Sequence, residues 1–483
     1  MKQTTKSLLG MLVLALVAGA VGGVALWARK DEEKKTEQKE KSDKLFDFDK
    51  SKARALRVEK DGKLVAALSR ADDKSSWKVT EPIAAEGDDQ AVSTMLDQLA
   101  GLKQKKDLAD EKDAGPYGLD APKLAVSVKL DDGKELGLQI GVDNSFDSTI
   151  YVRKLGDASI RIIDGYNRSN YDKSLLDLRD KSVAHLDEGA EIRRIEVSGV
   201  KAPYTLEKDG GKWKLGAVEA DASTADRVAD SVKSLKATGI ASEKAEGLAQ
   251  YGLDKAKVAV KLGVGTAGGK DTFTRTVLIG QPVKGGAAVK TFAKRDDSPV
   301  VFEVDSQIVK DLQKEPFDLQ DKSLVHAARE DVRKIVFAGP SGKLEIARAK
   351  DQPPDGGFAD ETFTVVAPQK GPAKKWKISS ALYSITGLRA TAFEGPLPKD
   401  PKGLAQFGLD KPRTVTLLGD KDAVLATVKI GAEKDGKRYV LAGDKIARVE
   451  KGTVDDLPWT LNDVLETPPP VASLPDGGVQ ASK

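Results

Sequence analysis

Alternating apolar residues follow each of three related tetrapeptides in this chain. The tetrapeptides are Tyr117-Gly118-Leu119-Asp120, Tyr251-Gly252-Leu253-Asp254 and Phe407-Gly408-Leu409-Asp410. The apolar positions after them are Leu124, Val126, Val128 and Leu130, then Val258, Val260 and Leu262, then Val415 and Leu417. A period of two is typical of a strand with one face on a core. The sequence therefore predicts a half-buried strand after each tetrapeptide.

A second predicted strand follows each of these and ends at an isoleucine-glycine pair. The pairs are Ile140-Gly141, Ile279-Gly280 and Ile430-Gly431. In the first copy, Asp131-Asp132-Gly133 separates the two strands and predicts an antiparallel hairpin. The glycine of each tetrapeptide, such as Gly118, predicts a left-handed turn that ends one element and pins the aromatic residue before it into the core.

A stretch with helical period precedes each tetrapeptide, and a tryptophan precedes each such stretch. The apolar residues are Val92, Met95, Leu96, Leu99 and Leu102, then Val228, Val232 and Leu235, then Leu382, Ile385 and Leu388. The tryptophans stand in Trp77-Lys78-Val79, Trp213-Lys214-Leu215 and Trp376-Lys377-Ile378. An apolar helical stripe of this kind covers one face of a sheet. We expect the tryptophans to anchor the core; the alternative is a sugar-stacking platform.

Each copy also closes in a similar way. The closing segments are Leu176-Asp177-Leu178-Arg179-Asp180, Phe317-Asp318-Leu319-Gln320-Asp321 and Trp459-Thr460-Leu461-Asn462-Asp463. Landmarks repeated three times in one order predict tandem units, each of a size to own its core. We predict an α+β protein with a single N-terminal transmembrane helix followed by three tandem α/β sandwich repeats with mostly antiparallel sheets.

The first thirty residues predict a membrane anchor. Residues 8–27 carry no charge and, as a helix, span about 30 Å, the thickness of the hydrocarbon core. Lys2 and Lys6 precede this run and favour a cytoplasmic N-terminus, with the body outside the cytoplasm. A cleaved signal peptide, with Ala18-Gly19-Ala20 at the cleavage site, is the alternative. Both interpretations export the body.

The predicted organisation follows from these boundaries. It comprises an anchor (1–30), a charged tether (31–52), three repeat units (53–187, 188–328 and 329–466) and a disordered Pro/Gly tail (467–483). The tether is almost entirely charged or polar before Leu45, so we expect it to be solvated. The tail begins Thr467-Pro468-Pro469-Pro470, which is typical of an extended chain.

Composition narrows the function. The net charge of +3 is the difference between 78 basic and 75 acidic residues, which are interspersed along the chain. A nucleic-acid-binding protein would gather its basic groups on one face, so we predict no nucleic-acid partner. The chain has no cysteine, which excludes disulfides, thiolate nucleophiles and a lipid-modified cysteine.

The two histidines of the chain occupy matching places. Asp180-Lys181-Ser182-Val183-Ala184-His185 recurs as Asp321-Lys322-Ser323-Leu324-Val325-His326. Ser182 with His185, or Ser323 with His326, would make a nucleophile and base of an unrecognised hydrolase. Three neighbouring residues rarely reach the geometry of a triad, and the third copy lacks the Lys, Ser and His. A structural segment leading into the next strand is the favoured interpretation.

Three further motifs resemble sites but depart from them. Residues 263–270 lack the spacing and the final Ser or Thr of a phosphate loop, and a hairpin loop is expected there. Gly339-Pro340-Ser341-Gly342 lacks the last glycine of a nucleophile elbow, and Asp351–Gly356 fails the calcium-loop pattern at Pro353. We therefore predict no catalytic, cofactor-binding or metal-binding residue, and no cofactor.

The N-terminal span, the charged tether, the Trp-hydrophobic step, Tyr-Gly-Leu-Asp, Ile-Gly and the Leu-Arg-Asp-Lys closing together resemble the bacterial domain-of-unknown-function family 4340. The resemblance is best in residues 53–187 and weakens in the third copy, where Phe407 replaces tyrosine. It implies a periplasmic envelope protein, often encoded beside an ABC transporter of the gliding-motility type. It brings no activity or catalytic residue. We expect a non-enzymatic accessory protein on the cell membrane, with ABC-transporter subunits as partners; a module that binds an envelope polymer or a small solute is the alternative.

Overall fold

The computed structural model describes residues 43–466 except 112, 188, 267–268, 286–288, 349–361, 396 and 399. The predicted span Leu8–Trp27, the Pro/Gly tail and the segment Asp351–Gly356 lie outside the described residues. Within the described part, no helix is long and apolar enough to cross a membrane. Leu45 and Phe46, near the end of the segment predicted as tether, are buried against the first sheet.

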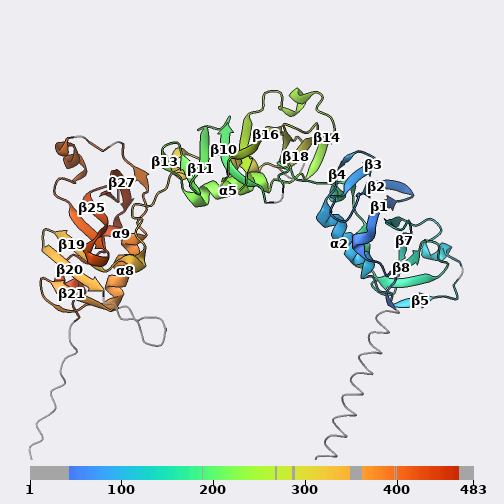
Figure 1. The fold of residues 1–483 in the computed structure, drawn as a ribbon, viewed down its shortest axis with the longest axis horizontal. Helices are drawn as coiled ribbons and strands as arrows, with labels where there is room; N and C mark the ends of the chain where they lie inside the picture. Colours follow the sequence, from blue (N-terminus) through green and yellow to red (C-terminus); the bar gives the residue numbers. More distant parts are fainter. Residues whose placement is uncertain are drawn as a thin grey trace, which may run out of the picture. The chain divides into compact units, whose positions relative to one another are not determined.

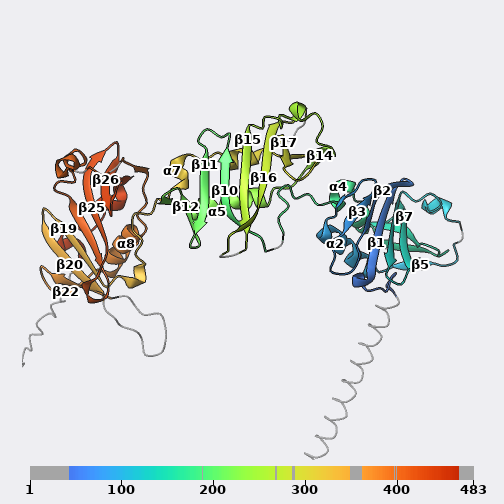
Figure 2. The ribbon, with the colours of Figure 1, turned by 45° about the horizontal axis from the view of Figure 1, so that its top comes forward.

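The described chain forms three nine-stranded sheets, and the strands of each sheet come from one predicted repeat. Their orders are β4-β3-β2-β1-β6-β7-β8-β9-β5, β13-β12-β11-β10-β15-β16-β17-β18-β14 and β22-β21-β20-β19-β24-β25-β26-β27-β23. The three orders are the same pattern written three times, with strands nine apart in number occupying the same place. The strands visible in Figures 1 and 2 follow this pattern. The predicted tandem, antiparallel α+β architecture is confirmed for these sheets.

The first sheet consists of β1 (Ala53–Lys60), β2 (Lys63–Ser69), β3 (Lys78–Glu81), β4 (Ala85–Glu86), β5 (Lys106–Leu108), β6 (Leu124–Leu130), β7 (Glu135–Asp143), β8 (Thr149–Lys154) and β9 (Ile160–Asp164). Its helical segments are η1 (Lys50–Lys52), α2 (Asp89–Ala100), η2 (Gly115–Tyr117), α3 (Asn167–Tyr171) and α4 (Leu175–Leu178). The turn after β6 is the predicted hairpin, because β6 and β7 pair antiparallel from Leu124 with Ile140 to Lys129 with Glu135.

The second sheet consists of β10 (Glu191–Ser198), β11 (Tyr204–Asp209), β12 (Lys212–Leu215), β13 (Val218–Glu219), β14 (Gly239–Ser242), β15 (Val258–Gly265), β16 (Asp271–Pro282), β17 (Lys290–Arg295) and β18 (Val301–Asp305). Its helical segments are α5 (Ala222–Lys233), η3 (Leu248–Tyr251), α6 (Gln307–Leu312) and α7 (Pro316–Leu319). The glycine-rich run 263–270 spans the end of β15 and the connection to β16, as expected of a hairpin loop.

The third sheet consists of β19 (Lys334–Gly339), β20 (Gly342–Arg348), β21 (Phe363–Ala367), β22 (Gly371–Pro372), β23 (Ala392–Phe393), β24 (Arg413–Leu418), β25 (Val424–Lys434), β26 (Lys437–Ala442) and β27 (Lys445–Glu450). Its helical segments are η4 (Arg329–Asp331), α8 (Lys375–Thr386), η5 (Pro401–Phe407), η6 (Asp420–Asp422), α9 (Lys451–Asp455) and α10 (Leu461–Val464). Pro340 and Ser341 form the turn between β19 and β20.

One long helix covers each sheet. In the first unit, α2 follows β4 and precedes β5, which are the two edge strands, so the connection that contains this helix runs from one edge of the sheet to the other. Its buried residues Val92, Met95, Leu96 and Leu99 join the same core as Leu56 and Val126 of the central strands. The predicted helical stripe is confirmed here. In α5 and α8 the buried residues again include the predicted ones, Val228 and Val232, and Leu382 and Ile385.

The tetrapeptide glycines adopt the predicted left-handed conformation. Gly118, Gly252 and Gly408 have φ of 67°, 65° and 65°, and each ends a 3-10 helix. The aromatic residue before each glycine is only half buried, however, which differs from the expected core position. It packs edge-on against a ring of the sheet: Tyr117 with Tyr151, Tyr251 with Phe292, and Phe407 with Tyr439. The leucine after the glycine is the buried residue, as Leu119 illustrates at 0% exposure.

The second strand does not end at the isoleucine-glycine pair. In each unit it continues past the pair through a register shift, between Ile140 and Asp143, Ile279 and Pro282, and Ile430 and Glu433. A β-bulge inserts a residue and increases the local twist. The pair therefore marks an irregularity within the strand that recurs in all three units, and not the end of the strand.

The prediction for Trp376 was wrong. Phe363 begins β21 at the place that Trp77 occupies just before β3, and both are buried, at 5% and 2% exposure. Trp376 instead lies in the first turn of α8 with 69% of its surface exposed. A hydrophobic step after a tryptophan fits a strand start and a helix start equally well, so the sequence pattern misplaced it. Trp77 and Trp213 are buried core anchors, as predicted.

The third closing segment was matched three residues too early. α4 and α10 each begin with a capping box, built by Ser174 with Asp177 and by Thr460 with Asp463. If these two caps are taken as equivalent, Leu465-Glu466 of the third unit correspond in position to Arg179-Asp180 of the first, and Asn462-Asp463 do not.

Candidate functional site: the joints and the hollows beside them

Every unit closes by pairing with the segment that leads into its own long helix. The pairs are Gly87 with Arg179, Ala220 with Gln320, and Ala373 with Leu465. On either side of the first pair, the Asp88 amide donates to Leu178 O at 2.9 Å and the Asp180 amide to Glu86 O at 2.8 Å. We call this recurring pair the closing ladder.

The residues that follow pair with the loop after the next long helix. Ser182 pairs with Lys236 and Ser323 with Arg389, and the segment before the first sheet makes the same pair through Lys44 and Lys103. The Val183 amide donates to Leu235 O at 2.9 Å, and Ala237 donates to Lys181 O at 2.7 Å. We call this the opening ladder. Residues 178–185 and 319–326, which include both ladders back to back, are termed the joints.

The first joint places the predicted Asp, Ser and His around one carboxylate. His185 Nδ1 lies 2.5 Å from Asp180 Oδ2, and the Ser182 amide donates to Asp180 Oδ1 at 2.9 Å. Burial alone would raise the pKa of Asp180, but these hydrogen bonds together lower it. The hydrogen bond to Asp180 raises the pKa of His185. Asp180 therefore organises a turn whose far end is His185, held at a φ of 44°.

The second joint repeats this arrangement more loosely. The Ser323 amide donates to Asp321 Oδ1 at 2.9 Å, whereas His326 Nε2 is 3.8 Å from Asp321 Oδ2. Ser323 and His326 border a hollow of 430 Å³ beside β25 and β26. Among the described residues, no hydrogen bond joins Ser182 to His185 or Ser323 to His326 through the serine hydroxyl. The hydroxyl-to-imidazole contact that a nucleophile needs is not formed in either joint.

The pKa of Asp221 is strongly lowered in the folded protein, and the sequence analysis did not identify this residue. It caps α5: its Oδ1 accepts hydrogen bonds from the Thr224 amide at 2.9 Å and the Ser223 hydroxyl at 2.6 Å. Its Oδ2 lies 2.7 Å from a guanidinium nitrogen of Arg389. Burial opposes ionisation, but these bonds outweigh it and hold the pKa of Asp221 far below its usual value. The sequence did contain a signal for this role, because an aspartate directly before an amphipathic helix is a typical N-cap residue.

In each of the first two units, a cationic side chain lies over the ring of the buried tryptophan. We call the place of this tryptophan, beside the start of the unit's third strand, the corner of the unit. The Arg70 guanidinium lies 4.9 Å from the ring centre of Trp77, and Lys208 Nζ lies 4.9 Å from that of Trp213. Arg70 also donates to Ala53 O at 2.9 Å, so it ties the end of β2 to the start of β1. The ring faces are thus occupied by protein groups, which opposes the sugar-stacking interpretation of these two tryptophans.

Hollows open beside both corners. The one next to Trp77 measures 390 Å³ and the one next to Trp213 measures 450 Å³. Both volumes fall within the roughly 300–1,000 Å³ that is usual for small-ligand sites. Their rims carry both signs of charge, through Lys50, Arg70 and Asp89 in the first and through Lys212, Asp221, Asp226 and Arg389 in the second.

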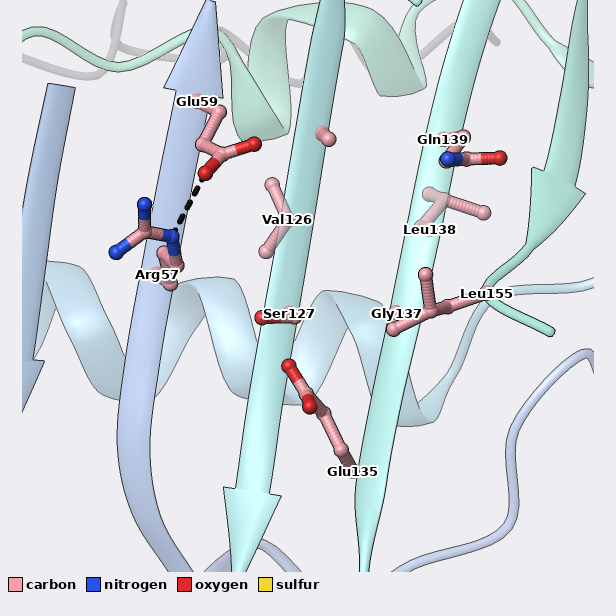
Figure 3. Close-up of a pocket in the computed structure, with 10 residues that line it drawn as sticks. Arg57, Glu59, Val126, Ser127, Glu135, Gly137, Leu138, Gln139 and Leu155 are labelled. Atoms are coloured by element: carbon pink, nitrogen blue, oxygen red, sulfur yellow. Dashed lines mark hydrogen bonds and ion pairs between the residues drawn. The ribbon is translucent and has the colours of Figure 1, made fainter. Parts of the chain in front are cut away.

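A smaller hollow lies on the open face of the first sheet (Figure 3). It measures 180 Å³ and is bordered by β1, β6 and β7. Arg57 donates to Glu59 at 2.7 Å across its rim, and Leu155 packs over Gly137, which has no side chain to displace it. Its volume is below the usual range for ligand sites, so it is the weaker candidate. In the described part of the chain, no group of three His, Cys, Asp or Glu could hold a metal ion.

The sheets and their joints define a tandem-repeat α+β protein with one helix-covered sheet per repeat. A family model described as Domain of unknown function (DUF4340) matches the chain three times, over residues 77–219, 214–394 and 363–469. These matches cover more than half of the chain, so the protein belongs to this family, as the sequence resemblance indicated. The matches begin at Trp77, Lys214 and Phe363, which agrees with the structural equivalence of Trp77 and Phe363. No curated protein and no solved structure matches the chain.

Proposed function

We propose that this protein is a non-enzymatic accessory component of the cell envelope, anchored in the membrane by residues 8–27 with its three units outside the cytoplasm. The observation that carries the non-enzymatic part is the use made of Asp180, Ser182 and His185. These residues hold the turn of a joint together, and Asp321, Ser323 and His326 occupy the same places in the next joint. Residues that recur as connectors favour a scaffold over a hydrolase.

The anchor is supported by the uncharged run Leu8–Trp27 and the lysines before it. Fusing a reporter that is active only outside the cytoplasm after Glu466 tests the topology. We expect activity from the full chain and none when residues 8–27 are deleted. A reporter that is active only in the cytoplasm, fused at the same place, is the matched control, and its activity would refute the proposed address.

We propose ABC-transporter subunits as the partner, on the basis of the family resemblance. The test is purification of the full chain from detergent extracts, followed by identification of the proteins that remain bound. A protein that keeps the anchor but ends at Lys52 is the control, because it retains membrane association without the units. Recovery of transporter subunits with the full chain alone supports the partner; their absence removes it.

A second candidate function is binding of a small polar solute in the hollow beside Trp213. Its volume of 450 Å³ and its mixed-charge rim support this. Changes in tryptophan fluorescence on adding short oligosaccharides or zwitterionic amino acids test it. Asp226 accepts a hydrogen bond from the Trp213 indole nitrogen at 2.7 Å, so Asp226→Asn should alter a genuine response at this site. A response that survives this change arises elsewhere.

A further inference from the structure

Two aromatic side chains stand exposed on the outer face of α8. Trp376 and Tyr383 have 69% and 72% of their surfaces exposed. They are seven residues apart, which places them on the same face about 10 Å from each other. Ser380 lies between them in the sequence and is also exposed, and Lys377 Nζ lies 5.8 Å from the centre of the Trp376 ring. We call Trp376, Ser380 and Tyr383 the aromatic face.

The fold does not require this face. The three long helices each have twelve residues and end two residues before a buried leucine, so their positions correspond one to one. The counterparts of Trp376 and Tyr383 are Gln90 and Asp97 in α2, and Ser223 and Asp230 in α5. Both earlier helices thus carry polar groups where α8 carries large rings. Helix packing alone leaves the pair in α8 unexplained.

The third unit has a second feature that the others lack. Its closing ladder ends at Glu466, whose amide donates to Pro372 O at 3.0 Å, and Pro372 lies only four positions before Trp376. The chain beyond continues with Thr467-Pro468-Pro469-Pro470 and reaches Pro475, whereas the first two closings lead into another unit. Glu466, the last described residue before the proline-rich segment, is therefore held close to the start of α8.

Proline-rich segments and exposed aromatic rings fit each other. Such segments adopt the polyproline II helix, which is preformed and docks on aromatic-lined surfaces at little entropic cost. With a rise of about 3.1 Å per residue, Pro468 to Val471 spans roughly 9 Å, close to the separation of the two rings. A tether of a few residues also gives an effective concentration on the order of millimolar, which sustains a weak contact.

We propose that the aromatic face of α8 is a docking site for a polyproline II segment, and that the chain's own residues 467–475 occupy it. The contact is intramolecular and covers Trp376 and Tyr383. This inference is independent of the membrane address and of the proposed partner.

The full chain labelled with 5-fluorotryptophan tests the proposal by fluorine NMR. Five tryptophans give five resonances, and Trp376→Gln, which installs the residue found in α2, identifies one of them. We expect the Trp376 resonance to move when residues 467–483 are deleted, and to move in the same way when Pro468, Pro469 and Pro470 are replaced by serine. The other four resonances should stay in place. A peptide of residues 467–483, added at millimolar concentration to the truncated chain, should restore the original position.

An unchanged Trp376 resonance after deletion overturns the proposal. A shift that disappears on dilution of the full chain also overturns it, because the occupant would then be the tail of a second copy. If the position of the Trp376 resonance does not change on deletion of the tail but changes on addition of anionic lipid vesicles, the aromatic face would instead bind a membrane surface. Tyr383→Asp, the residue of α2 and α5, should weaken the response to the peptide and leave unfolding unchanged.

Discussion

The carbonyl oxygen of Tyr117 lies where a side chain on Gly141 would have to stand. The same collision would occur between Gly280 and Tyr251 and between Gly431 and Phe407. The two motifs of each repeat are therefore two halves of one contact: the turn of the tetrapeptide presses its backbone against the bulge in the neighbouring strand. Only glycine lacks the Cβ atom that this approach excludes.

Gly141→Ala should destabilise the first unit by about 2–3 kcal/mol, since the clash is with backbone and cannot be relieved by a rotamer change. Hydrogen exchange of β6 and β7, followed by mass spectrometry, measures the loss of protection. Gly395→Ala is the control, because a Cβ there meets no atom within 4 Å. Equal effects of the two changes would contradict the proposed contact.

Trp77→Ala and Trp376→Ala should differ sharply. Removing the buried Trp77 ring leaves a cavity and uncovers the Arg70 contact, at a cost of about 3–5 kcal/mol. Trp376 is mostly exposed, so its loss should change stability by less than about 0.5 kcal/mol. Urea unfolding followed by circular dichroism gives both values. Comparable losses would restore Trp376 as the third core anchor.

The Asp180–His185 pair should make stability depend on pH. The pKa of His185 is raised in the folded protein, so the pair stabilises fully below the unfolded pKa of about 6.5. That contribution is lost as pH rises through the raised pKa. Asp180→Asn should therefore flatten the change in unfolding midpoint between pH 6 and 8.5.

His326→Gln is the matched control for this experiment. Its ring is 3.8 Å from Asp321 and more exposed than that of His185, so its removal should alter the pH profile less. Because the chain has only two histidines, comparing the two variants shows which histidine causes the change of stability with pH. A profile that is steeper in Asp180→Asn than in the unmodified protein would contradict the sign.

Arg389→Met should weaken the second joint. Asp221 has a lowered pKa, so its hydrogen bonds stabilise above an unfolded pKa of about 3.9, and that contribution is lost as pH falls through the lower folded value. At pH 7 the loss of the guanidinium leaves one carboxylate oxygen without its charged partner. We expect a destabilisation of about 1–2 kcal/mol, which is smaller at pH 3.

Lys201→Met provides the comparison. Lys201 is 2.9 Å from Glu315, a similar distance, but both side chains are more than half exposed. We expect no measurable change in the urea midpoint, because solvent screens such a pair. If the urea midpoint falls as much as in Arg389→Met, burial of Asp221 is not the reason that its contact with Arg389 stabilises the protein.

Several features of the fold followed from local pattern. Apolar alternation identified the central strands, because half-buried strands must alternate in any sheet. The helical stripe of Val92, Met95, Leu96 and Leu99 identified the covering helix for the same reason. Gly118 and its two counterparts announced a left-handed turn, since glycine is the residue that adopts that conformation without strain. These are properties of a residue and its near neighbours.

The candidate site was harder to read from the sequence. The joint residues Asp180, Ser182 and His185 were found, but their partners, Glu86 and Lys236 among them, are distant in the chain and could not be assigned. Asp221 and Arg389 were missed altogether, because a carboxylate acquires an unusual pKa only when folding buries it beside a cation.

The sequence by itself determined that one unit occurs three times, where the long helix and a few central strands of each unit lie, and where the left-handed turn of each tetrapeptide falls. The tertiary structure alone decided that Phe363 rather than Trp376 is the buried ring of the third unit, why Gly141 must lack a side chain, and how each joint pairs with segments that flank two different long helices. The physical reason is that burial and close contact depend on residues separated by tens of positions. Local periodicity carries no information about which of two similar rings the sheet will cover.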